Sequence, residues 1–109
     1  MATRIVITGA GVISPIGAGL ADFEKALYAG ESGAGPSQLL GDGVMAAEVR
    51  DFTPQQWLGN KGIRVLDRTA RLLCVAAQMA LSEAGRGGGG STEADPECGL
   101  VCGTMFGSI

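Results

Sequence analysis

The strongest fold signal in this 109-residue sequence is the stretch DRTARLLCVAAQMALSEAG, residues 67–85. Asp67 is a favourable N-cap residue and Gly85 is a typical terminator, so the stretch predicts one helix between them. Strongly polar positions are few inside it, and most of its circumference carries small or apolar side chains. We therefore expect this helix to be buried on more than one side.

Two short apolar runs predict strands that bracket this helix along the chain. Residues 4–8, RIVIT, are rich in β-branched side chains and end at a glycine. Residues 98–102, CGLVC, are also apolar and also end at a glycine. Both runs are typical of buried extended structure, and we expect both to be strands.

The rest of the chain predicts one further helix and two irregular connections. Apolar residues recur at helical spacing after Leu20, and Gly30 is expected to end that helix. Residues 31–60 predict an irregular connection with one short strand and one helical turn, and residues 87–96 a flexible polar linker. This order is typical of an α/β protein with parallel strands and helices on both faces. Two strands do not complete such a sheet, so we expect residues 1–109 to be part of one domain, completed by another chain or by further sequence.

The composition argues against several classes of protein. Hydrophobic residues make up 46% of the chain and charged residues 17%, with a mean hydropathy of +0.27, so the chain is expected to fold. A net charge of −3 without a basic cluster argues against nucleic-acid binding. The apolar run near the N-terminus is broken by glycines and a proline, and predicts neither a signal peptide nor a membrane span.

The cysteine and histidine counts limit the chemistry that the chain performs unaided. Three cysteines, an odd number, are expected to stay reduced in the cytoplasm. The chain has no histidine, and Cys98 and Cys102 lack the further ligands of a zinc site, so no metal ion is expected. A cysteine nucleophile is conceivable, but Cys74 and Cys102 are better explained as small hydrophobic residues of a helix and a strand.

The glycine-rich stretch TGAGVISPIG, residues 8–17, invites a dinucleotide-binding interpretation because it follows a predicted strand. The fingerprint fails at Ser14, where its third glycine belongs, and Pro15 interrupts the expected helix start. A tight structural turn is the better interpretation, and a fragment of an NAD-dependent oxidoreductase is kept as an alternative.

Three stretches together resemble the N-terminal portion of β-ketoacyl synthases, the condensing enzymes of fatty-acid and polyketide assembly. They are RIVITGAGVISPIG at residues 4–17, LDR at residues 66–68 leading into the small-residue helix, and GLVCGTMFG at residues 99–107. Three shorter motifs between these stretches also match the family, in the same order: FEKAL at residues 23–27, GESG at 30–33 and DF at 51–52. The resemblance therefore covers essentially the whole chain.

This resemblance implies an α/β, thiolase-like fold, of which residues 1–109 are the incomplete N-terminal part of an αβαβα-layered domain. It implies decarboxylative Claisen condensation by a cysteine that accepts an acyl group, with two histidines that assist decarboxylation and hold the enolate. In the family all three lie beyond the segment matched here, so no catalytic residue is expected in this chain. The absence of histidine agrees with the assignment, and no cofactor is implied.

The resemblance also implies a role for the glycine-rich turn near residue 105. In the family this turn lies near the dimer interface, where a bulky side chain gates the acyl pocket. Met105, Phe106 and Gly107 fall in the matching turn, with Phe106 at the gate position, and we expect them to line the acyl pocket. Met105 stands where many members have glycine, and the alternative is that Met105 and Phe106 are ordinary core or interface residues.

The partners implied by the resemblance are the remainder of the ketosynthase, an acyl carrier protein, and a ketosynthase-type subunit in a homo- or heterodimer, with no nucleic acid and no membrane. Two further functions stay open. One is a subunit of the chain-length-factor kind, which keeps the fold and lacks the nucleophile. The other is an independent interaction module without catalytic activity.

Overall fold

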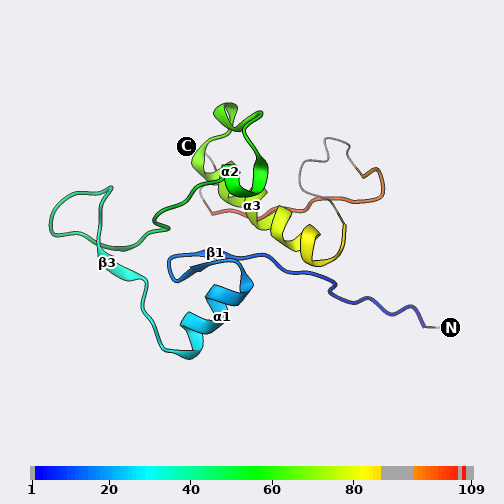
Figure 1. The fold of residues 1–109 in the computed structure, drawn as a ribbon, viewed down its shortest axis with the longest axis horizontal. Helices are drawn as coiled ribbons and strands as arrows, with labels where there is room; N and C mark the ends of the chain where they lie inside the picture. Colours follow the sequence, from blue (N-terminus) through cyan, green and yellow to red (C-terminus); the bar gives the residue numbers. More distant parts are fainter. Residues whose placement is uncertain (1, 87–94, 106, 108–109) are drawn as a thin grey trace.

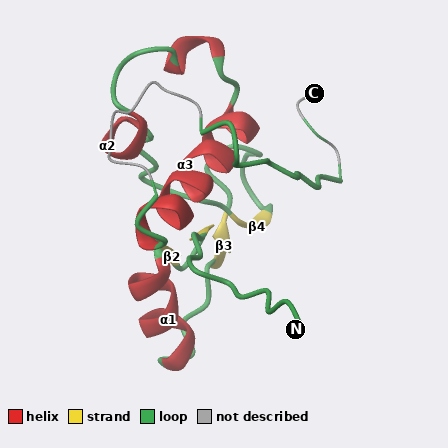
Figure 2. Ribbon diagram, turned by 90° about the vertical axis from the view of Figure 1, so that its right-hand side faces the viewer, coloured by secondary structure: helices red, strands yellow, loops and turns green. Residues whose placement is uncertain are grey.

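The computed structural model describes residues 2–86, 95–105 and 107 of the chain. Two antiparallel hairpins, three α-helices and one 3-10 turn are formed within these residues (Figure 1). In chain order they are β1 (Ile13–Ser14), β2 (Gly17–Ala18), α1 (Leu20–Tyr28), β3 (Ala34–Pro36), β4 (Met45–Ala47), α2 (Gln55–Leu58), the 3-10 turn (Ile63–Val65) and α3 (Arg68–Glu83). Figure 2 shows α2 beside α3, with α1 at one end of the molecule and β3 next to β4.

Helix α3 has the boundaries that its sequence predicts. The Asp67 carboxylate accepts a hydrogen bond from the backbone N–H of Ala70 at 2.8 Å, which caps the first turn. After the helix ends at Glu83, Gly85 adopts a φ of 71°, a left-handed conformation that glycine reaches without steric cost. The expectation of burial on several sides is confirmed only in part, because Val75 alone is fully buried in α3 and most other positions are half-buried.

The small side chains of α3 allow the glycine-rich N-terminal segment to approach the helix closely. A Cβ atom built on Gly11 would lie 2.0 Å from the carbonyl oxygen of Ala76. A Cβ atom on Gly9 would lie 2.2 Å from the carbonyl oxygen one turn further along α3. Between them, the backbone N–H of Ala10 donates to the Glu83 carboxylate at 2.7 Å. The glycines of this segment are therefore required by packing of backbone against backbone.

The segment before α1 is a tight hairpin, where the sequence predicted a loop. Strands β1 and β2 pair Ser14 opposite Gly17, and the Ser14 hydroxyl donates to the carbonyl of Gly17 at 3.1 Å. A Cβ on Gly17 would lie 2.6 Å from the backbone nitrogen of Phe23, so the hairpin sits directly on the first turn of α1. The predicted end of α1 is confirmed, because the helix stops at Tyr28 and Gly30 has a φ of 70°.

The connection over residues 31–60 holds more regular structure than its composition predicts. The apolar residues 45–47 form the one expected strand, β4, and the expected helical turn is α2. Strand β3 was not predicted, since its sequence, Ala-Gly-Pro, has low strand propensity. It forms because residues 34–36 pair in antiparallel register with residues 47–45.

The two strands predicted at residues 4–8 and 98–102 are not formed, and neither is the parallel sheet that they imply. Both segments are irregular and exposed, with Ile7 at 92% and Val101 at 99% exposure. Cys102 is therefore exposed, which corrects its interpretation as a buried strand residue. A strand forms only where a neighbouring strand satisfies its backbone hydrogen bonds, and neither segment has such a neighbour among the described residues.

The hydrophobic core of the described residues is correspondingly small. Its buried hydrophobic side chains are Ala26, Ile63 and Val75. The Cα radius of gyration is 16.1 Å, compared with about 13 Å for a compact domain of about this length. Across the described part of the chain, no helix combines the length and apolar character that crossing a membrane requires.

Candidate functional site

The main candidate site is a surface hollow of about 340 Å³ between the β3–β4 hairpin and the beginning of α3. The hairpin contributes Gln38, Leu39 and Glu48, the segment after β4 contributes residues 49–53, and α3 contributes Arg68. A second hollow of about 230 Å³ is also lined by residues 49–52, together with Trp57 and residues of the β1–β2 hairpin. Residues 49–52 therefore line both hollows.

Two arginine side chains of the first hollow are held in position by backbone carbonyl groups. Arg68 donates through Nη2 to the carbonyl of Val49 at 2.6 Å, and its guanidinium carbon lies 5.7 Å from the centre of the Phe52 ring. Arg50 donates through Nη2 to the carbonyl of Pro36 at 2.7 Å. Each guanidinium has five N–H groups, so both retain the capacity to bind a carboxylate or phosphate.

Two carboxylates line the same hollow, and one of them organises the hairpin. Glu48 accepts hydrogen bonds from the Ser37 hydroxyl and from the backbone N–H groups of Gln38, at 3.0 Å, and Leu39, at 3.3 Å. The hydrogen bond from Ser37 is the main cause that lowers the pKa of Glu48, followed by the backbone hydrogen bond from Gln38. Asp51 has a φ of 53°, the left-handed conformation, which non-glycine residues seldom adopt.

The hollow itself is lined by two arginines and two carboxylates, but the stretch of sequence that contributes Arg50 and Arg68 is basic although the chain as a whole is acidic. Residues 50–71 contain five of the eight basic residues and only two acidic ones, a net charge of +3 in a chain of net charge −3. We call these five residues the basic strip: Arg50, Lys61, Arg64, Arg68 and Arg71. The sequence analysis found no basic cluster and so did not single out the strip, for which the spacing of residues 61, 64, 68 and 71 was the available signal.

Met105 and Gly107, two of the three residues predicted to gate an acyl pocket, are not among the residues that line this hollow. Met105 is exposed, and the backbone N–H of Gly107 donates to the Thr104 hydroxyl at 3.0 Å. Gly107 has a φ of 63°, which glycine adopts readily. Phe106 lies outside the described residues. The structure therefore places Met105 on the surface and Gly107 in a half-buried position, and it leaves their role as a prediction.

The described residues show where the cysteines lie and what the glycine-rich turn packs against. Cys74 is half-buried in α3, and Cys98 and Cys102 are exposed; all three are free thiols. Among the residues that the structure describes, no group of three or more histidine, cysteine, aspartate or glutamate side chains is placed to hold a metal ion. Close packing of Gly9 and Gly11 against carbonyl groups of α3 accounts for both glycines without a bound dinucleotide.

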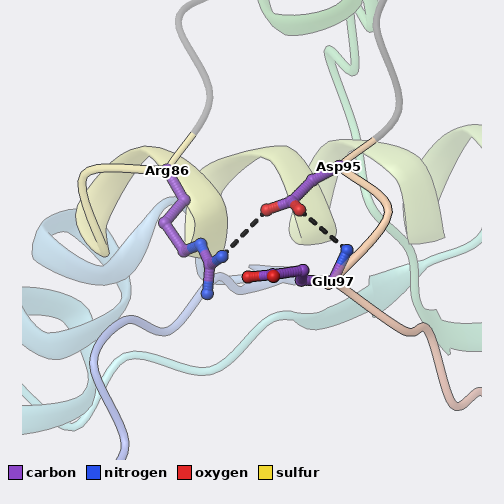
Figure 3. A network of polar contacts seen from close by, with 3 residues as sticks. All are labelled: Arg86, Asp95 and Glu97. Atoms are coloured by element: carbon purple, nitrogen blue, oxygen red, sulfur yellow. Dashed lines mark hydrogen bonds and ion pairs between the residues drawn. The ribbon is translucent and has the colours of Figure 1, made fainter.

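A separate polar contact joins the end of α3 to the segment that begins at residue 95 (Figure 3). Arg86 Nη2 lies 2.9 Å from the Asp95 carboxylate, which also accepts a hydrogen bond from the backbone N–H of Glu97 at 2.9 Å. Both side chains of the ion pair are about half exposed, so the pair contributes little stability in water. Its role is to hold residue 95 close to the end of α3.

The known proteins that are similar to this chain are β-ketoacyl synthases. Residues 2–108 match the family model for the β-ketoacyl synthase N-terminal domain. The chain is 40% identical over 86 residues to 3-oxoacyl-[acyl-carrier-protein] synthase 2 of Coxiella burnetii, covering 75% of this chain and 21% of that protein. It is 35% identical over 111 residues to the oxytetracycline polyketide putative β-ketoacyl synthase 1 of Streptomyces rimosus, covering 97% of this chain and 25% of that protein.

A solved structure is also similar. The ishigamide ketosynthase/chain length factor matches with a TM-score of 0.67 and 38% sequence identity, over 73% of this chain and 21% of that chain. The chain therefore spans about a fifth to a quarter of the length of the relatives that it matches.

Proposed function

This chain belongs to the β-ketoacyl synthase family, and on that premise we propose that it forms the N-terminal part of an enzyme for decarboxylative Claisen condensation. The observation that carries the proposal is the match of residues 2–108 to the N-terminal domain of that family. In the proposed reaction, a cysteine thiolate outside residues 1–109 takes an acyl group from a thioester and releases the donor thiol. A malonyl thioester then loses carbon dioxide, and its enolate carbon attacks the acyl-cysteine, which forms the new bond and frees the thiolate.

Residues 1–109 contribute structure to this enzyme, as the N-terminal part of one thiolase-like domain. The exposed apolar segments at residues 4–8 and 98–102 support this assignment, since soluble proteins rarely leave such segments uncovered. Further sequence or a second polypeptide covers them and supplies the catalytic cysteine and the two histidines. The reaction takes place in the cytoplasm, where the three thiols of this chain stay reduced.

The partner that delivers the acyl groups is an acyl carrier protein, and the complete enzyme is a dimer of ketosynthase type. The name of the Coxiella relative includes an acyl carrier protein. The basic strip supports a carrier partner for this chain, because a net charge of +3 over residues 50–71 attracts an acidic protein surface. The two guanidinium groups of the hollow are pre-positioned by backbone carbonyls, which lowers the entropy cost of binding.

The turn at Met105, Phe106 and Gly107 gates the acyl pocket in this proposal, with Phe106 limiting the length of the chain that enters. Replacement of Phe106 by alanine would then admit longer acyl chains. Product analysis of the Phe106→Ala enzyme by mass spectrometry tests this role. An unchanged product distribution would assign the turn to ordinary packing.

The proposed activity is tested by locating the acyl-enzyme bond. The purified protein, with every polypeptide that accompanies it, is incubated with an acyl thioester and analysed by peptide mapping. We expect the acyl group on a cysteine outside residues 1–109, because this chain has no histidine to serve as a base for Cys74, Cys98 or Cys102. An acyl group on one of these three cysteines would contradict the assignment.

A second candidate function is a subunit of the chain-length-factor kind. The similarity to the ishigamide ketosynthase/chain length factor favours it, since that name covers both kinds of subunit. In this case the protein would remain unacylated and would form a complex with a separate ketosynthase. The same peptide-mapping experiment distinguishes the two, because the acyl group would then appear only on the partner.

A further inference from the structure

We draw no further inference here: the strongest candidate, the hollow of about 310 Å³ between the N-terminal segment, the start of α1, Trp57 and the last turns of α3, carries none because nothing in the structure shows what covers it.

Discussion

Replacement of Gly11 by alanine tests the packing of the N-terminal segment against α3. The new Cβ would lie 2.0 Å from the carbonyl oxygen of Ala76 and 2.8 Å from Cβ of Met79. Real Cβ atoms essentially never come closer than 3.0 Å to such neighbours, so the segment must move by at least 1.0 Å. That movement also disturbs the neighbouring hydrogen bond from Ala10 N–H to the Glu83 carboxylate.

The expected cost follows from these two effects. Overpacking of this kind costs about 1–3 kcal/mol, and loss of an exposed hydrogen bond about 1 kcal/mol more at most. We predict that Gly11→Ala lowers the free energy of unfolding by about 2–3 kcal/mol, measured by urea denaturation of the purified protein with an unchanged m-value.

The matched control is Gly35→Ala in β3. A Cβ at Gly35 would meet only the Nη2 atom of Arg50, at 3.5 Å, which is an ordinary contact. Its effect is expected to be below about 0.5 kcal/mol. Equal midpoints for the Gly11 and Gly35 variants would refute the close approach of the glycine-rich segment to α3.

Three further predictions concern single side chains and use the same denaturation measurement. Asp67→Ala removes the cap on Ala70 N–H and should cost about 1 kcal/mol, whereas Asp67→Asn retains a capping oxygen and should cost less; equal losses would argue against capping. Asp51→Gly should be tolerated, whereas Asp51→Val should destabilise the protein by about 1 kcal/mol or more, because a β-branched residue fits a φ of 53° poorly. A larger loss of stability for Asp51→Gly than for Asp51→Val would contradict the left-handed conformation. Because the pKa of Glu48 is lowered, the stabilising effect of its carboxylate is complete above the ordinary pKa of 4.5 and is lost as the pH falls through the lower folded-state value. Glu48→Gln should therefore reduce the acid sensitivity of unfolding. An unchanged pH profile would contradict a stabilising role for the hydrogen bonds that the Glu48 carboxylate accepts.

The elements that the sequence predicts correctly are those with local determinants. The N-cap at Asp67 and the glycines after α1 and α3 act within one turn of their helices, so the boundaries follow from neighbouring residues alone. The family was likewise identified from ordered local motifs, and the match over residues 2–108 confirms it.

The elements that the sequence misjudges depend on distant partners. Residues 4–8 have strong strand propensity but no strand beside them in the described structure, whereas residues 34–36 have weak propensity and form β3 by pairing with β4. The hollow was also beyond prediction, because Arg68 reaches it from α3 to meet the carbonyl of Val49, nineteen positions earlier. Side-chain bonds to backbone carbonyls leave no periodic signal in a sequence.

We propose that residues 1–109 are one part of a larger ketosynthase domain. The most direct measurement is a native mass spectrum of the purified material, with a denaturing spectrum beside it to identify every polypeptide present. We predict that the 11.0 kDa segment occurs within, or bound to, a polypeptide that carries the catalytic cysteine and two histidines. A stable, folded monomer of 11.0 kDa without a partner would contradict it and would favour an independent interaction module.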